Sequence, residues 1–148
     1  MDAITVSLRV TAPEIGPARV SVGRRQFSIG RPVEFDDASP HVSALEYALG
    51  AVGGELVNGL REFSRRRRIA IDAVEALVTG ELEHALTYLD VVGERSSPQL
   101  ARIRIRLFVS APDESAVRTI FDDMRDRLPL LCTLRRSVDV QADLVLTS

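Results

Sequence analysis

The sequence predicts an α+β fold in which a mainly antiparallel sheet packs against two helices. In several segments apolar residues alternate with polar ones, as expected for strands that bury one face. Two other segments repeat their apolar residues every three or four positions, which is typical of amphipathic helices. The order of these segments is strands, helix, strands, helix, strand, and this order favours the α+β class over regular βαβ alternation.

The N-terminal third of the chain predicts two strands and two turns. Residues 4–10 alternate regularly and predict a half-buried strand, and the prolines and glycine of 11–17 predict a turn. A second strand is expected over 18–29, with a turn or bulge at 23–25. Residues 30–42 are rich in turn formers and predict a loop.

A long helix is predicted to begin at Ser43 and to run to about Arg66. Ser43 is a favourable N-cap residue, and Glu46 follows it by three positions, which forms a capping-box pattern. The helix contains four glycines, each of which costs about 1 kcal/mol relative to alanine. Because a helix keeps such residues only where close packing requires them, we expect it to be buried against other backbone.

The middle of the chain predicts two more strands joined by a short, irregular segment. Residues 69–82 are rich in Ile, Val and Ala and predict a strand with a possible bulge. Residues 84–98 predict a short helical segment and an exposed loop. Residues 100–109 show the clearest alternation in the chain, with apolar residues on one face and three arginines on the other: Arg102, Arg104 and Arg106.

The C-terminal part predicts a second helix and a last strand. Ser110 is expected to cap the helix, and Pro129 is expected to end it. Residues 138–146 again alternate and predict a strand. With 148 residues and no repeat, the chain is expected to form one domain over residues 1–148.

Composition narrows the possible functions. The net charge is −2, with 21 acidic and 19 basic residues and only seven Phe and Tyr, so we expect no binding of nucleic acid. One cysteine and two histidines supply neither an intramolecular disulfide nor an ordinary zinc site, and no cofactor motif is present. No apolar run is long enough to span a bilayer, and the first residues lack a signal-peptide pattern. We therefore expect a cytoplasmic protein without metal or cofactor.

The first helix resembles the central helix of the OsmC/Ohr family (osmotically inducible protein C and organic hydroperoxide resistance proteins), whose pattern reads roughly N-P-x-E-L-L-x-A-A-L-G-S-C. The residues SALE at 43–46 align with N-P-x-E, and VGGE at 52–55 align with L-G-S-C. The resemblance covers about residues 18–146. It implies an OsmC-like fold, an intertwined homodimer with the central helices at its centre, and reduction of organic hydroperoxides by two cysteines.

Neither family cysteine is present in this chain. Glu55 stands at the position of the reactive cysteine, and Leu128 stands at the position of the second cysteine, which opens a C-P-x-x-x-T-L segment in the family. A carboxylate neither forms a disulfide nor attacks a peroxide as a thiolate does. The leading hypothesis is therefore a divergent protein that binds a small apolar or organic ligand at a dimer-interface pocket, with Glu55 and Glu46 at its polar end.

Each residue of this expected pocket has a second interpretation. Glu55 acts as a general acid or base or contacts a ligand, or else it forms a salt bridge with an arginine. The resemblance implies that Glu46 pairs with an arginine from the N-terminal region, such as Arg24 or Arg25, whereas the local pattern makes it a capping-box residue. Two apolar residues complete the expected pocket: Val52 and Leu128.

Two further hypotheses remain open. In one, Cys132 is a relocated reactive thiol of a hydroperoxide reductase, activated by a neighbouring arginine and reduced by an external thiol. The alternative for Cys132 is a small buried side chain. In the other hypothesis, the chain has a structural or protein-interaction role, and the contacts are made by the arginines of 65–68 and of the strand over 100–109.

Overall fold

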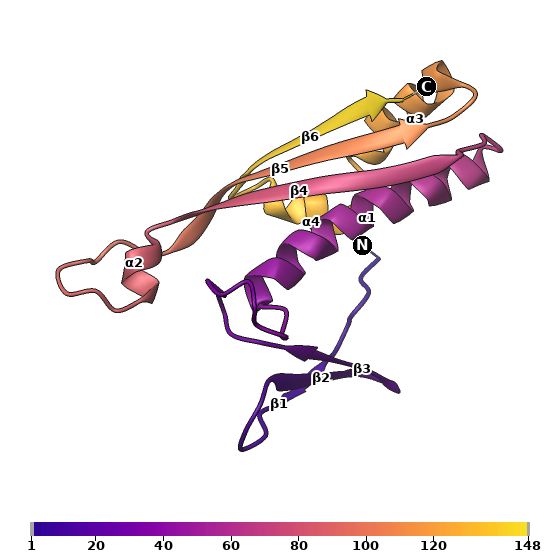
Figure 1. Ribbon diagram of the computed structural model, residues 1–148. Helices are drawn as coiled ribbons and strands as arrows, with labels where there is room; N and C mark the ends of the chain where they lie inside the picture. The colour runs from indigo at the N-terminus through magenta and orange to yellow at the C-terminus, as the bar shows by residue number, and fades with distance from the viewer. Residues whose placement is uncertain (1, 148) are drawn as a thin grey trace. The chain divides into compact units, whose positions relative to one another are not determined.

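The computed structural model describes residues 2–147 (Figure 1). The chain divides into two compact units, Met1–Ala48 and Leu49–Ser148, which are described separately below. The expectation of one domain over the whole chain stays a prediction.

The N-terminal unit is built on a three-stranded antiparallel sheet in the order β1-β2-β3. Its strands are β1 (Arg9–Thr11), β2 (Ala18–Val22) and β3 (Arg25–Ile29). The turn predicted at 23–25 is confirmed as the β2–β3 hairpin turn, where Gly23 has a φ of 60°. The strand predicted over 4–10 is wrong in extent, because only its last two residues belong to β1 and the preceding apolar side chains are exposed.

Helix α1 (Ala44–Arg66) begins and ends where the sequence predicts. Its apolar face is buried as expected, and three of its side chains are fully enclosed in the second unit: Val52, Leu56 and Leu60. The expectation that other backbone packs on the helix glycines is wrong at Gly53 and Gly59. A Cβ atom at either position would instead meet a neighbouring side chain.

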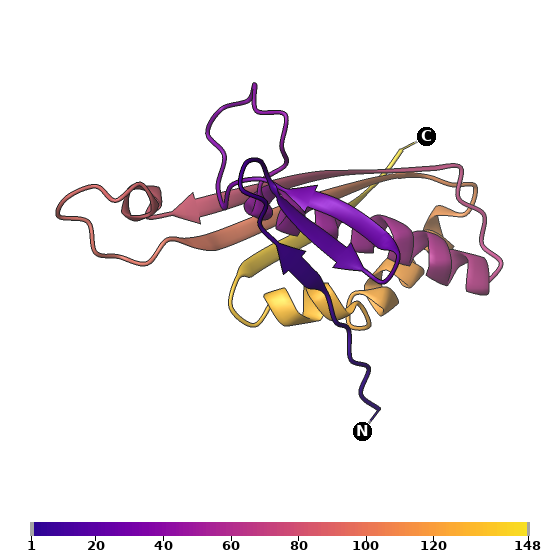
Figure 2. The same ribbon diagram turned by 90° about the horizontal axis from the view of Figure 1, so that it is seen from below.

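The second unit contains a mixed sheet in the order β4-β5-β6. Strands β4 (Ala73–Glu83) and β5 (Gln99–Ser110) form a long antiparallel hairpin, with a register shift near the end of β4. The short helix α2 (Ala85–Tyr88) lies in the connection between them (Figure 2). Strand β6 (Asp139–Leu146) pairs with β5 in parallel, a pairing that the alternation pattern alone does not specify.

Helices α3 (Glu114–Met124) and α4 (Pro129–Leu134) form the crossover from β5 to β6. Two predicted boundaries are wrong here. Ser110 is the last residue of β5, and the cap is Asp113, whose carboxylate accepts an N–H of the first turn at 3.0 Å. Pro129 begins α4 rather than ending a longer helix, since the fixed φ of proline suits the first helical position.

One face of the β4–β6 sheet forms the core of this unit. The inward side chains of β5 are at most 1% exposed, and they pack with buried residues of α1, α3, α4 and β6. The opposite face carries the arginines of β5 and is open to solvent within the described chain. Helices α1, α3 and α4 therefore cover the same face of the sheet.

Candidate functional site

The carboxylate of Glu55 binds the beginning of α4. Its two oxygens accept the backbone N–H groups of Leu130 and Leu131, both at 2.8 Å. Glu55 is half-buried in the middle of α1, and the two residues that it binds lie 75 and 76 positions further along the chain. This long-range contact fixes the start of α4 to the side of α1.

The local sequence of α4 explains why it needs this acceptor. Leu128 is the N-cap residue, and its apolar side chain accepts no hydrogen bond. Pro129 has no N–H, so Leu130 and Leu131 carry the first free donors of the helix. A carboxylate that accepts both is a cap supplied by a different helix, and negative charge at a helix N-terminus is favourable.

The ion pairs among residues 2–147 do not include Glu55. The arginine salt bridge considered for this residue is therefore not formed within the described chain. The partners of the carboxylate are instead two main-chain groups, a contact that sequence reasoning missed. The available signal was the Leu-Pro pair at 128–129, which starts a helix without a polar capping side chain.

Glu55 and Leu128 belong to the same contact between α1 and α4. One turn after Glu55, a Cβ atom at Gly59 would lie 2.8 Å from a methyl carbon of Leu128. Leu128 is 5% exposed and Val52 is fully buried, so both are part of the apolar core. The two positions at which the resemblance places cysteines thus lie where these helices touch.

Glu46 forms the predicted capping box with Ser43. The Ser43 N–H donates to the Glu46 carboxylate at 3.0 Å, and the Glu46 N–H donates to the Ser43 hydroxyl at 3.1 Å. The hydrogen bond from the Ser43 backbone to the carboxylate, and after it the Ser43 hydroxyl, hold the pKa of Glu46 below its ordinary value of 4.5.

Arg24 and Arg25, the other polar residues expected at the site, lie in the β2–β3 hairpin of the N-terminal unit. Arg24 is in the turn, Arg25 begins β3, and both are exposed. In the described part of the chain no ion pair joins either of them to Glu46. Their role in ligand binding stays a prediction.

Cys132 is a half-buried thiol on α4. A guanidinium nitrogen of Arg135 lies 3.7 Å from the sulfur, and the sulfur lies 3.7 Å from the carbonyl oxygen of Arg125. The same Arg135 nitrogen also donates to Asp126 at 3.0 Å. The cationic neighbour required by the hypothesis of a reactive thiol is therefore present, but an acid shares it.

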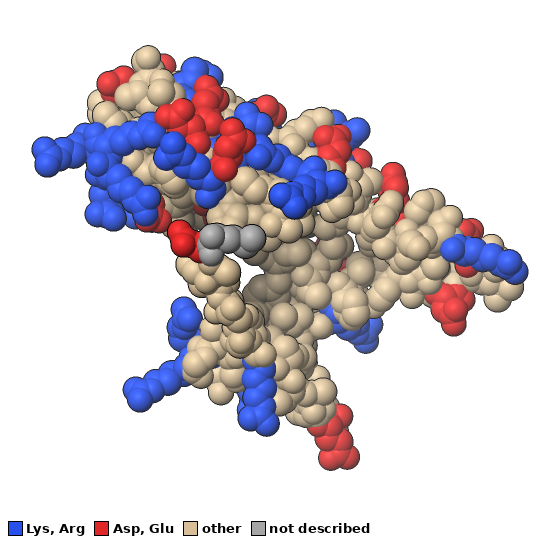
Figure 3. Space-filling view, turned by 180° about the vertical axis from the view of Figure 1, so that it is seen from behind, with Lys and Arg blue, Asp and Glu red and all other residues tan. Residues whose placement is uncertain are grey.

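The arginine-rich segments are partly neutralised. On the outer face of the sheet, Arg102 bonds Asp139 at 3.0 Å and lies 3.9 Å from Glu81. In the run at the end of α1, Arg66 pairs with a glutamate one turn earlier and Arg67 pairs with an aspartate of α3 at 2.9 Å. Basic and acidic side chains accordingly lie close together on this unit (Figure 3).

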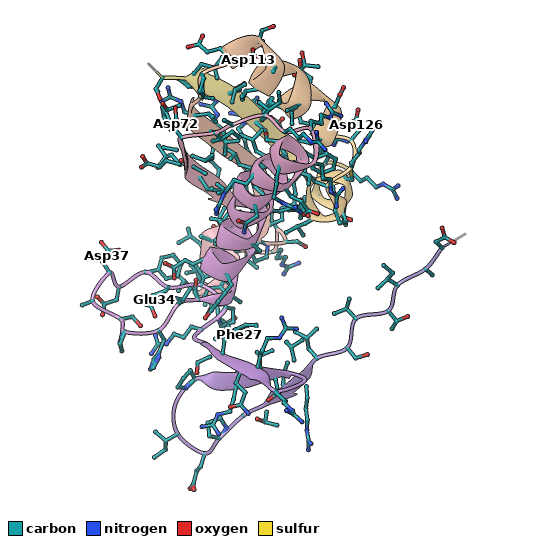
Figure 4. All side chains as sticks on the ribbon, turned by 90° about the vertical axis from the view of Figure 1, so that its right-hand side faces the viewer. Phe27, Glu34, Asp37, Asp72, Asp113 and Asp126 are labelled. Carbon is teal, nitrogen blue, oxygen red and sulfur yellow. The ribbon has the colours of Figure 1, made fainter. Side chains whose placement is uncertain are left out.

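A separate cavity of about 560 Å³ lies within the N-terminal unit, between the sheet and the loop that follows β3. Glu34 and Asp37 belong to this loop (Figure 4). Glu34 accepts the N–H groups of Phe35 and Asp36, so its carboxylate shapes the loop. No group of side chains among residues 2–147 is suited to hold a metal ion, and no helix in that range is long and apolar enough to cross a membrane.

No protein-family model and no curated protein matches this sequence. Solved structures do match it over nearly their whole length. An OsmC-like protein from Mycoplasma pneumoniae superposes with a TM-score of 0.79 at 14% identity over 100% of both chains. The chain has the OsmC/Ohr fold.

Two further structures with this fold are named for hydroperoxide resistance. The organic hydroperoxide resistance protein OsmC from Legionella pneumophila matches with a TM-score of 0.69 at 10% identity, over 97% of this chain and 98% of that one. The organic hydroperoxide resistance protein OhrB of Bacillus subtilis matches with a TM-score of 0.62 at 14% identity, over 96% and 98%. At these identities the similarity establishes the fold of the chain and leaves its chemistry to its own residues.

Proposed function

We propose that this chain is a cytoplasmic, homodimeric binding protein with the OsmC/Ohr fold that lacks thiol peroxidase chemistry at the α1–α4 contact. Its ligand is a small apolar or organic molecule held where two copies meet. The observation that carries the proposal is the bidentate cap made by Glu55. Both carboxylate oxygens hold backbone at the place where the resemblance requires a reactive thiol, and Leu128 is an apolar core residue.

The N-terminal sheet supports the dimer. The pairing Val10–Val20–Phe27 places these three residues on one face, where Val20 is 2% exposed and Phe27 packs on Tyr47, but Val10 on the edge strand β1 is 63% exposed. Apolar side chains left exposed on an edge strand are unfavourable in water unless something covers them. In the proposed dimer, the second copy covers this edge.

The polar residues assigned to the proposed pocket are Glu46 and Glu55, with Arg24 and Arg25. Glu46 offers a carboxylate whose ionised form is favoured by the hydrogen bonds from Ser43, which lower its pKa. The guanidinium group of an arginine offers several N–H donors to a carboxylate or to a polar group of a ligand. In the second unit, Val52 and Leu128 are buried at the contact between α1 and α4.

Two measurements test the proposal. Sedimentation over a range of concentrations should give a dimer, and a monomer throughout would contradict the assembly. A thermal-shift assay with cumyl alcohol, a neutral analogue of cumene hydroperoxide, should raise the melting temperature. The shift should be smaller in Arg24→Ala/Arg25→Ala and unchanged in the control Arg19→Ala, a residue on the polar face of β2. An equal shift in all three proteins would contradict this pocket.

A second candidate function is a hydroperoxide reductase that uses Cys132. The observation in its favour is the Arg135 guanidinium 3.7 Å from the sulfur, because a nearby cation stabilises a thiolate. The thiolate would attack the O–O bond, release an alcohol and become a sulfenic acid, and two equivalents of an external thiol would return it to the thiol with loss of water.

The two functions are separated by a turnover assay. We expect no consumption of cumene hydroperoxide by the purified protein in the presence of dithiothreitol. Consumption that disappears in Cys132→Ser and persists in Glu55→Gln would establish the reductase instead of the binding protein.

A further inference from the structure

A groove of about 780 Å³ lies in the second unit between the C-terminal half of α1 and the segment that leads into β4. Its apolar lining comes from both sides. Val57 belongs to α1, Ile69 and Ile71 belong to the segment that follows, and Val74 lies at the start of β4. All four are half-buried and pack against the core, so the base of the groove is fixed. Glu55 and Cys132 are not among the residues that line it.

Three arginines line the same groove: Arg61, Arg65 and Arg68. None of them takes part in an ion pair among residues 2–147. Their neighbours Arg66 and Arg67 are both paired with acids and do not line the groove. The run of four arginines at the end of α1 therefore separates into two paired members and two that are free and line the groove.

The acids near the groove leave a positive excess. Glu62 lines it but pairs with Arg66, and Asp72 lies at the β4 end, where its N–H donates to the Ser110 carbonyl. Among the charged residues that line the groove, three arginines and one acid, Asp72, thus have no ion-pair partner within residues 2–147. Charge complementarity favours an anion.

Ser64 adds an unused polar group. Its side chain is 1% exposed and lies among the residues that line the groove. Within the described chain its hydroxyl has no hydrogen-bond partner, which is unusual for a buried hydroxyl. This oxygen is itself buried, so it lies beneath the surface of the groove and is not one of the groups that hold a ligand.

We propose that this groove binds an amphipathic anion, an acidic headgroup on a medium-length alkyl chain. Arg65 and Arg68 hold the headgroup through charge-assisted hydrogen bonds, and Arg61 flanks it. The alkyl chain of the ligand lies on the apolar base of the groove, which Val57 and Ile71 form. The volume is within the range of small-molecule sites, about 300–1,000 Å³. The groove is separate from the pocket of the proposed function and does not depend on it.

The test is isothermal titration calorimetry of the full chain with four probes. Decanoate and decyl phosphate have the same ten-carbon alkyl chain and different acidic headgroups. Decanol has the alkyl chain without the charge, and acetate has the charge without the long alkyl chain. Decanoate or decyl phosphate should bind, and the tighter of the two identifies the headgroup. Decanol and acetate should bind at least about tenfold more weakly, since each keeps only one of the two interactions.

Matched variants locate the site. Arg65→Gln/Arg68→Gln should weaken binding of the anionic probe by about tenfold or more, because charge-assisted bonds are lost. Arg66→Gln/Arg67→Gln removes the same charge from the same run and should leave the affinity within about twofold. Ala70→Phe fills the groove without changing charge and should also weaken binding. Circular dichroism confirms that each variant is folded.

Several results would overturn the proposal. Equal losses in the two double variants would indicate unspecific attraction to the arginine run. Decanol binding as tightly as decanoate would exclude a role for the acid. Binding of a DNA duplex but of no alkyl anion, lost in Arg65→Gln/Arg68→Gln, would make the groove a nucleic-acid surface. A parent dimer that becomes a monomer in that variant would make it an interface between copies.

Discussion

Replacing Glu55 with alanine removes both acceptors that hold the start of α4. The two bonds are 2.8 Å long, and the donors belong to Leu130 and to Leu131, a residue that is 1% exposed. A hydrogen bond to a charged group contributes about 1.5–3 kcal/mol, and loss of a helix cap costs about 0.5–2 kcal/mol. Because Glu55 is only half-buried and the bonds share one carboxylate, we expect a loss of about 2–4 kcal/mol in the free energy of unfolding.

Glu55→Gln should cost less than Glu55→Ala. The amide keeps one acceptor oxygen, but it turns a donor group toward the second N–H, so we expect about 1–2 kcal/mol. Glu62→Ala is the matched control, because this acid lies on the same helix and, among residues 2–147, pairs only with exposed Arg66. An exposed pair of this kind is worth about 0.3–0.5 kcal/mol.

Denaturant unfolding followed by circular dichroism measures these free energies, and hydrogen exchange measures the amides directly. The amides of Leu130 and Leu131 should lose protection in Glu55→Ala more than amides of β5, since the opening is local to α4. If Glu55→Ala and Glu62→Ala have the same stability, or if the α4 amides keep their protection, then the carboxylate does not cap α4 and the argument fails.

Two further predictions concern helix α1. Gly53→Ala places a Cβ atom 2.6 Å from a methyl carbon of Val78 and should destabilise by about 1–3 kcal/mol, whereas at Gly54 nothing lies within 4 Å and alanine should stabilise the isolated chain by about 0.5–1 kcal/mol. Urea unfolding measures the change in the free energy of unfolding for each variant, and the two changes should have opposite signs. Changes of the same sign at both positions would contradict the prediction. Glu46 has a lowered pKa in the folded state, so its charge stabilises the fold above its unfolded pKa, and this contribution disappears as the pH falls through the folded value. The melting temperature of Glu46→Gln should therefore lie below that of the parent at pH 7 and meet it in acid, and a gap independent of pH would refute the prediction.

Much of the fold could be predicted from local patterns. The capping box at Ser43 and Glu46 predicts the start of α1, and the alternation over 100–109 predicts β5, because both features depend on residues close together in the chain. The prediction of a strand over 4–10 was wrong because it depends on residues far away in the chain. Alternation shows that one face of a segment is apolar, but a strand also needs a neighbour to pair with, and within 4–10 only Arg9 and Val10 pair with β2.

The site was predictable only in part. The resemblance of the central helix singles out Glu55, the resemblance of residues 128–134 singles out Leu128, and the structure brings the two residues to one helix contact. The acceptor role of Glu55 could not be predicted, because its partners are backbone N–H groups 75 and 76 residues away. Every residue except proline carries a backbone N–H, so the sequence does not show which N–H groups bind a distant side chain. The one indication is a helix start, such as Leu128-Pro129, that lacks a polar capping residue.

The cap shows that α1 and the start of α4 can be joined at this place without a thiol. In the family that the sequence resembles, the residues at positions 55 and 128 would form a covalent link between the central helix and the start of the next segment. Here the carboxylate ties the same two elements together through two short hydrogen bonds. This link involves no thiol, so oxidants and reductants cannot open it. The contact between α1 and α4 is therefore held by main-chain hydrogen bonds that do not depend on the redox state of the surroundings.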